Sequence, residues 1–201
     1  MILWTIQPEK VYDLILSKGV YRCEESLMVN TEKPFKVSYK WLIKQMKRRL
    51  GNPPAGVKYP VWAWYQWEGR RKKPDLRQER WSCGWEGEKF VCMEIDIPDE
   101  NVLLSDFDSW SLILSDALIP ITEEENSEYL EYEKYYESLS PKEKKVFKEK
   151  NWELVFDLTP IHNDWTIRGD SIQATFWELQ KEQIRKVWHF TSAYKKPIYL
   201  N

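Results

Sequence analysis

The stretch PVWAWYQWEG, residues 60–69, places three tryptophans and a tyrosine within ten residues. In an extended strand, alternation puts Val61, Ala63, Tyr65 and Trp67 on one face and Trp62, Trp64 and Gln66 on the other. Both faces are then largely apolar, which predicts a strand that is covered on both sides of its sheet. Such a strand is either part of an aromatic core or a wall on which a flat ligand stacks, and composition leaves both interpretations open.

The remaining patterns predict a mixed α+β domain. A strand over residues 2–7 is followed by a helix that starts at Pro8 and has Gly19 as its C-terminal cap. Apolar residues at helical spacing predict a second helix over 35–50. Further strands are expected at 89–98, 172–179 and 187–190, and further helices at 105–117, 122–140 and 140–151, while 152–158 either extends the last helix or forms a strand.

Length and charge distribution favour one domain spanning residues 1–201. Its most distinct part is the stretch 123–150, whose charged composition predicts a helical insertion. The net charge of −2 gives no general preference for nucleic acid, although 40–49 and 70–80 are basic and 123–137 is acidic. These charges either complement one another within the fold or form a face for a polyanion.

Several classes of protein find no support in the sequence. The three cysteines form no CxxC pair, and with two histidines no metal site is expected. Dinucleotide-binding, phosphate-binding and serine-hydrolase motifs are absent. No apolar run approaches the length of a membrane span and no signal peptide is visible, so a cytoplasmic protein without a membrane partner is expected.

A few polar residues stand out against this background. Asp106 and Asp108 either bind a metal or serve acid–base chemistry, or cap the helix that follows them. Gln173 lies on an otherwise buried strand and needs a hydrogen-bond partner from the core or from a ligand. His162 is more consistent with a surface loop than with catalysis. The loop 70–80, next to the aromatic strand, has the ingredients of a nucleic-acid groove or is a solvated charged loop.

Stretches along nearly the whole chain resemble an uncharacterised bacterial family, the domain of unknown function numbered 3841. They are LWTIQ, SYKWLIKQMKRR, YPVWAW, KPDLR, EIDIPDENVLLSDFDSW and IQATFWEL. This resemblance is specific but implies no activity.

A more distant resemblance is to ADP-ribosyltransferase-like domains. It is carried by the strand, helix and Gly-Val order at the start, the aromatic middle strand, and the late strand followed by a polar turn. It implies a split, mainly antiparallel central sheet flanked by helices, with NAD as substrate. The catalytic residues implied by position are Thr5, Gln173 and Glu178. The residues implied to bind NAD are Gln7, Trp62, Trp64, Tyr65 and Arg77, with the arginine pairing to the pyrophosphate.

The sequence departs from that pattern in its catalytic positions. The first strand has no histidine or arginine, and the neutral amide of Gln173 has no proton-accepting carboxylate. Glu178 lies five residues later and is expected on the opposite face. The fold can therefore be retained while the transfer chemistry is altered or lost.

Three functions follow as alternatives. The first is an ADP-ribosyltransferase-like enzyme that modifies a nucleic-acid or protein acceptor, as a bacterial toxin or phage-defence effector with an antitoxin partner. The second is a non-catalytic module that binds a nucleotide or single-stranded nucleic acid. The third is a structural protein whose aromatic residues all lie in the core.

Overall fold

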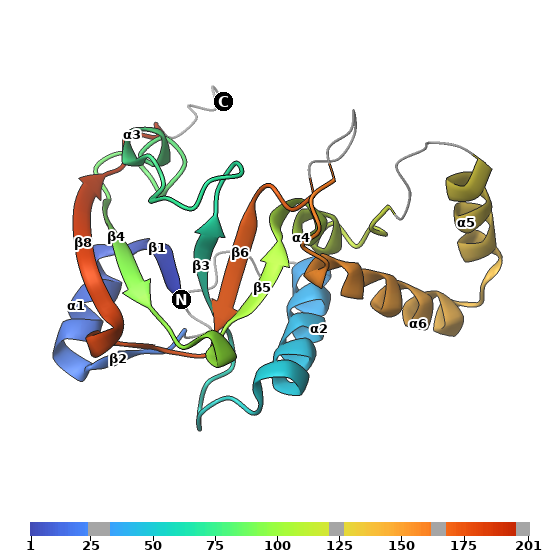
Figure 1. Cartoon of the computed structure of the whole chain (residues 1–201), viewed down its shortest axis with the longest axis horizontal. Helices are drawn as coiled ribbons and strands as arrows, with labels where there is room; N and C mark the ends of the chain where they lie inside the picture. The colour runs from blue at the N-terminus through green and yellow to red at the C-terminus, as the bar shows by residue number, and fades with distance from the viewer. Residues whose placement is uncertain (24–32, 121–126, 162–167, 196–201) are drawn as a thin grey trace, which may run out of the picture.

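The protein has one central sheet flanked by helices (Figure 1). The structure is a computed structural model that describes residues 1–23, 33–120, 127–161 and 168–195. The strands are β1 Ile2–Pro8, β2 Val20–Tyr21, β3 Val61–Gln66, β4 Lys89–Asp96, β5 Leu103–Asp106, β6 Ile172–Phe176, β7 Leu179–Gln180 and β8 Ile184–Thr191. The helices are α1 Glu9–Lys18, α2 Lys33–Leu50, α3 Leu76–Glu79, α4 Phe107–Leu114, α5 Ser127–Ser138 and α6 Pro141–Asn151. Short 3₁₀ turns are η2 Asp99–Asn101, η3 Trp152–Phe156 and η4 Lys181–Gln183.

The main sheet has six strands in the order β5-β6-β3-β1-β4-β8, and all neighbouring strands are antiparallel. The short strands β2 and β7 pair separately. The predicted α+β fold, with a mainly antiparallel sheet flanked by helices, is therefore confirmed.

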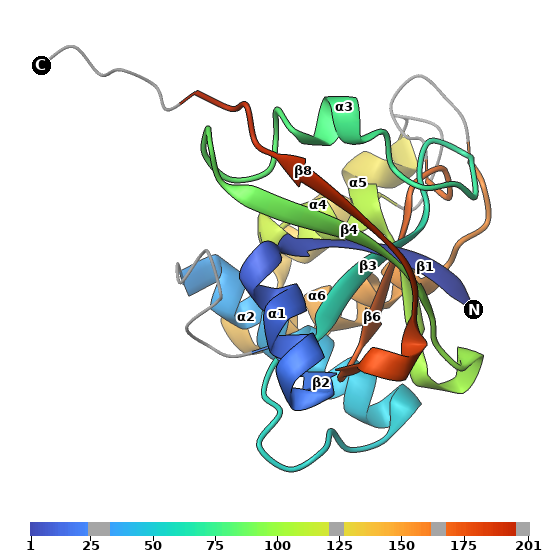
Figure 2. The same ribbon diagram turned by 90° about the vertical axis from the view of Figure 1, so that its left-hand side faces the viewer.

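The sheet is continuous on either side of its middle but weakly joined at the middle itself. Strand β1 pairs with β4 at every residue from Ile2 to Pro8, whereas it pairs with β3 through Trp4 and Trp64 alone. From that pair the two strands diverge toward the end of β1 and the start of β3 (Figure 2). The sheet thus consists of two halves, β5-β6-β3 and β1-β4-β8, that separate in a V.

Each face of the aromatic strand β3 enters a different apolar cluster, as its alternation predicts. Val61 and Ala63 pack in the cluster that includes Val11 and Ile15 of α1. Trp62 packs on the opposite cluster, which is formed chiefly by α2, α4 and η3 and includes Trp41, Leu42, Met46, Trp110, Ile113 and Trp152. Strand β3 is therefore a central strand covered on both sides.

The helix α2 covers the half-sheet β5-β6-β3 through one face. Its buried side carries Trp41, Leu42 and Met46, and its last turn carries the exposed basic residues Lys47, Arg48 and Arg49. This is the amphipathic pattern expected of a helix on a sheet. Ser38 lies within the contact and donates a 2.7 Å hydrogen bond to the carbonyl of Ile113 in α4.

The stretch 123–150, predicted to be a helical insertion, contains α5 and nearly all of α6, and both helices project away from the sheet (Figure 1). Residues 123–126 of that prediction lie outside the described residues. Ser140 and Glu143 form a capping box at the start of α6, and Pro141 occupies its first position. The buried side chain of Asn151 joins α6 to the domain by bonding both the N–H and the C=O of Ile119, at 2.7 and 2.8 Å.

Element ends differ from the sequence expectations at several places, and β4 and β6 end at Asp96 and Phe176, before the expected residues 98 and 179. Helix α4 ends at Leu114 and not at residue 117, because Asp116 adopts a left-handed conformation with φ of 61°. Residues 152–156 form a 3₁₀ turn, and β8 begins at Ile184 and not at 187. In the described ranges, no helix combines the length and the apolar character that crossing a membrane requires.

Candidate functional site

A cleft of about 780 Å³ opens where β1 and β3 separate. Five parts of the chain contribute to it: the end of β1 with the start of α1, β2, α2, the start of β3, and the loop before β4 together with the segment after β8. Its lining residues are Gln7, Pro8, Lys10, Val11, Tyr21, Cys23, Phe35, Tyr39, Pro60, Val61, Trp62, Ser82, Gly84, Trp85, Glu88, Phe90 and Tyr194. The volume lies within the range of small-molecule and cofactor sites.

Aromatic rings form one wall of this cleft. Tyr39 packs edge-to-face on Trp62 with ring centroids 6.3 Å apart, and Trp110 lies 5.3 Å behind Trp62. These distances are typical of aromatic pairs that hold each other in place. Burial raises the pKa of the Tyr39 phenol to about 12, and the hydroxyl is protonated at neutral pH, as a phenol with its ordinary pKa also is.

Two polar residues of β1 stand at the point where the sheet divides. The Thr5 hydroxyl donates a 2.8 Å hydrogen bond to the carbonyl of Trp62, which spans the two half-sheets. Gln7 Nε2 in turn donates a 2.9 Å hydrogen bond to Thr5 Oγ1. Thr5 is almost completely buried, while Gln7 lines the cleft. Thr5 therefore fixes the orientation of the Gln7 amide and does not itself reach the cleft surface.

Two charged side chains, Lys10 and Glu88, are found among the described residues that line the cleft. Lys10 belongs to the first turn of α1. Glu88 precedes β4, and its Oε2 accepts a 3.2 Å hydrogen bond from the backbone N–H of Trp85. The cleft thus presents one cation, one carboxylate, a fixed amide and an aromatic wall.

Trp64 and Gln173 are neighbours across the sheet but do not belong to the cleft lining. Trp64 packs on Trp67 and Phe107, with centroids 4.5 and 5.2 Å away. Gln173 Oε1 is buried and has no hydrogen-bond partner among the described residues. Core packing accounts for Trp64, and the partner expected for Gln173 is not found in the described part of the chain.

Tyr65 and Arg77 also lie apart from the cleft lining. The guanidinium of Arg71 covers the Tyr65 ring at 3.5 Å. The Arg77 side chain is 90% exposed and forms a 2.6 Å ion pair with Asp75, which lowers the pKa of that carboxyl to about 2. Arg77 therefore lies on the protein surface, paired within its own short helix.

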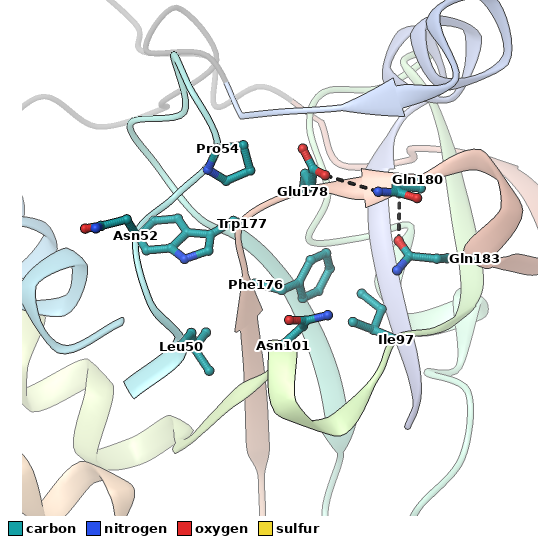
Figure 3. Close-up of a pocket in the computed structure, with 10 residues that line it drawn as sticks. All are labelled: Leu50, Asn52, Pro54, Ile97, Asn101, Phe176, Trp177, Glu178, Gln180 and Gln183. Atoms are coloured by element: carbon teal, nitrogen blue, oxygen red, sulfur yellow. Dashed lines mark hydrogen bonds between the residues drawn. The ribbon is translucent and has the colours of Figure 1, made fainter. Parts of the chain in front are cut away.

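Glu178 lines a second, smaller pocket of about 210 Å³ near the end of β6 (Figure 3). Its carboxylate receives a 2.9 Å bond from Arg22 and a 3.2 Å bond from Gln180 Nε2. Because both carboxylate oxygens are engaged, the structure gives Glu178 a role in joining the segment after β6 to that after β2.

Asp106 and Asp108 are separated by their environments. The Asp106 oxygens accept 2.8 Å bonds from the backbone N–H groups of Ser109 and Gly169, so this carboxylate caps α4 and anchors the chain before β6. Burial and the charges of Asp106 and Asp170 raise the pKa of Asp108. The capping interpretation therefore accounts for Asp106. His162 lies outside the described residues.

The cysteines give no evidence of a nucleophile in the part of the chain that is described. Burial raises the pKa of Cys83 to about 11 and that of Cys92 to about 12, so both remain neutral thiols at physiological pH. Cys23 lines the cleft and has an isolated bridge to Tyr59.

Of the eight residues proposed from sequence, the structure brings Gln7 and Trp62 to the cleft and Thr5 to its base. Lys10, Tyr39 and Glu88 were not anticipated. The sequence offered one indication for Tyr39, which occupies an apolar position of its helix although its phenol hydroxyl needs a hydrogen-bond partner or contact with solvent. Lys10 and Glu88 had no comparable signal, because neither follows a motif.

The fold and the cleft define an α+β domain with a split antiparallel sheet and an aromatic pocket at the split. The family model of a domain of unknown function, DUF3841, matches residues 2–185, and the chain belongs to that family. No match was found among curated proteins or among solved structures. The resemblance to ADP-ribosyltransferases is accordingly not confirmed by these comparisons.

Proposed function

We propose that the protein binds NAD in the cleft between β1 and β3 and transfers ADP-ribose to a nucleic-acid or protein acceptor. The observation that carries the proposal is the division of the central sheet at the single pair Trp4–Trp64, with an aromatic cleft at the division. A split sheet that holds NAD between its halves is also what the sequence resemblance implies. A transferase of this kind would act as a bacterial toxin or phage-defence effector, kept inactive by an antitoxin.

The lining chemistry supports a dinucleotide with a flat, positively charged ring. Trp62 and Tyr39 offer aromatic surface to nicotinamide. The fixed Gln7 amide and the protonated Tyr39 hydroxyl supply directional hydrogen bonds. Lys10, in the first turn of α1, supplies a positive charge for the pyrophosphate.

The transfer step requires the bond between the ribose C1′ and the nicotinamide nitrogen to break. The bonding electron pair leaves with nicotinamide, which becomes neutral, and a cationic ribose remains. A carboxylate in the cleft stabilises this cation and accepts the proton that the acceptor nucleophile loses as it bonds to C1′. Glu88 is the carboxylate among the described lining residues, and we assign it this role in place of Glu178.

Thermal unfolding in the presence of NAD tests the binding step. NAD at 100 times its dissociation constant is expected to stabilise the protein by about 2.7 kcal/mol. AMP and nicotinamide, tested separately, show which half of the dinucleotide contributes. An unchanged unfolding temperature at millimolar NAD would contradict the proposal.

Release of nicotinamide from NAD tests the chemical step. Glu88→Gln is expected to lower the rate at least 100-fold while NAD still binds, because the amide has no charge to stabilise the ribose cation. Glu86→Gln is the matched control, since Glu86 is also exposed in this loop but does not line the cleft. Binding without turnover in the wild type would identify a non-catalytic nucleotide-binding module.

A further inference from the structure

We propose that the acceptor is a single-stranded nucleic acid, and that it docks at the cleft on Trp81, Trp85 and Tyr194 and along the basic loop 70–80 that leads to them. This inference extends the proposed function by naming the acceptor and its binding surface. We refer to this surface as the rim. Single strands bind where exposed aromatic rings that stack on bases lie beside cations that contact phosphates.

The aromatic component consists of three exposed rings. Trp81 is 58% exposed, Trp85 43% and Tyr194 40%. Trp85 and Tyr194 are stacked with centroids 5.4 Å apart and an interplanar angle of 30°, and both line the cleft. Large aromatic side chains are costly to leave in water when they have no ligand. Their position therefore indicates a surface that a flat partner covers.

The cationic component lies in the same loop. Six basic and two acidic side chains occur between Arg70 and Arg80. Arg71, Lys73 and Arg77 already contact Tyr65, Trp188 and Asp75, respectively. Arg70, Lys72 and Arg80 are exposed and have no carboxylate partner among the described residues. The Arg80 guanidinium lies 5.8 Å from the centroid of the exposed Trp81 ring, and the charges of these three cations remain available for phosphate groups.

Arg80 and Glu86 are held in place by backbone hydrogen bonds to the segment that follows β8. The carbonyl of Arg80 accepts a 2.7 Å bond from Ala193 N–H, and the Tyr194 carbonyl accepts a 2.8 Å bond from Glu86 N–H. Preorganised loops lose less conformational entropy when they bind a ligand. These bonds hold Arg80 close to the stacked pair of Trp85 and Tyr194, whereas Arg70 lies farther along the loop, where its backbone pairs with that of Trp67.

Acidic residues make the two ends of the rim differ in charge. Glu86 and Glu88 follow Trp85 toward the cleft, whereas the three available cations lie on the other side of Trp81 in the sequence. Phosphates are repelled at the first end and attracted at the second. The strand backbone is thus expected to follow the cations while a base stacks on Trp85 and Tyr194, next to the pocket proposed for NAD.

The test is fluorescence anisotropy of labelled 20-mers of dT and of rU, measured without NAD at a series of salt concentrations. Arg70→Glu/Lys72→Glu/Arg80→Glu removes the available cations. Lys134→Glu/Lys142→Glu/Lys150→Glu, on α5 and α6, makes the same change in net charge far from the rim (Figure 1). Trp81→Ala removes an exposed ring, and Leu130→Ala is its control on α5, with a similarly exposed side chain.

We expect the rim triple variant to weaken oligonucleotide binding at least 10-fold and to reduce the slope of log K against log salt by about 2, and the control triple to have a much smaller effect. Trp81→Ala is expected to weaken binding about 5-fold or more, and Leu130→Ala to leave it unchanged. The comparison of dT with rU identifies which nucleic acid is preferred.

Two results would overturn the inference. One is equal loss of binding in the two triple variants, which indicates attraction by overall charge. The other is the absence of oligonucleotide binding at low salt, which leaves a protein as the acceptor. NAD binding, measured in the same variants, is expected to be unaffected. If NAD binds and oligonucleotides do not, the rim inference fails and the NAD proposal stands. If oligonucleotides bind and NAD does not, the NAD proposal fails and the rim is still a nucleic-acid site.

Discussion

Replacing Thr5 by valine removes the hydroxyl that joins the two half-sheets and keeps the shape of the side chain. The Thr5 Oγ1 hydrogen bonds to the Trp62 carbonyl and to Gln7 Nε2 are both lost. Thr5 is 1% exposed, so water cannot readily take the place of its hydroxyl. The perturbation therefore acts on the division of the sheet and on the orientation of Gln7 together.

The magnitude follows from the group left without a partner. An unsatisfied acceptor in a buried site costs about 1–3 kcal/mol, and valine leaves no cavity, so Thr5→Val is expected to lower the free energy of unfolding by about that amount. Gln7 is half-buried and its amide can turn toward solvent. Loss of the hydrogen bond from Gln7 to Thr5 is therefore expected to lower the affinity for NAD and not the free energy of unfolding. Thr5→Ser keeps the hydroxyl and loses one methyl group, at about 1 kcal/mol.

Urea unfolding followed by tryptophan fluorescence measures the first effect, and calorimetric titration with NAD measures the second. The two variants are expected to have comparable stability, while Thr5→Val binds NAD at least 5-fold more weakly than Thr5→Ser. The reasoning is refuted if Thr5→Val is as stable as the wild type, or if both variants bind NAD equally well.

Three other predictions concern stability. Asp106→Ala leaves the Ser109 and Gly169 N–H groups without an acceptor and is expected to lower the free energy of unfolding by about 2–5 kcal/mol in urea, whereas Asp108→Asn has a much smaller effect. The raised pKa values of Cys92 and Tyr39 favour the neutral forms of both side chains in the folded state. Their contribution to stability is therefore complete below about pH 9 and falls as the pH rises toward 12. Cys92→Ala and Tyr39→Phe are expected to reduce that fall when urea unfolding is compared at about pH 8 and about pH 10.5. Arg22→Ala removes a partly exposed ion pair with Glu178 and is expected to change the free energy of unfolding by less than about 1 kcal/mol, and a larger loss would show a more important structural role for this pair.

The sequence predicted the elements well where a local pattern determines them. Alternation in β3 predicted that both its faces are covered, and Gly19 adopts the left-handed conformation expected of a helix C-cap, with φ of 77°. The start of the last helix was likewise expected at residue 140, where Ser140 caps α6. Each of these features depends on residues within a few positions of one another.

The candidate site was predicted only in part, because its geometry depends on register between distant strands. The pairing of Trp64 with Gln173 and the β-bulge between Trp64 and Gln66 are set by residues more than 100 positions apart. At the bulge, Gln66 Nε2 donates hydrogen bonds to the carbonyls of Gly169 and Asp170, so Gln66 does not join Trp62 in the cleft lining, although alternation places both on one face.

The remaining lining residues come from elements that no local sequence pattern brings together. Tyr39 lies in a helix, Glu88 at the end of a long loop and Lys10 in the first turn of α1. Their convergence follows from the separation of β1 and β3 after a single pair, and no local pattern encodes that separation.

Calorimetric titration of NAD into the wild type, Gln7→Leu and Gln180→Leu tests most directly whether the cleft at the split is the binding site. Both variants replace a glutamine by leucine, one in the cleft and one in the smaller pocket of Figure 3. We predict saturable binding to the wild type, at least 10-fold weaker binding to Gln7→Leu, and unchanged binding to Gln180→Leu. Absence of binding to the wild type, or weakening confined to Gln180→Leu, would contradict the account.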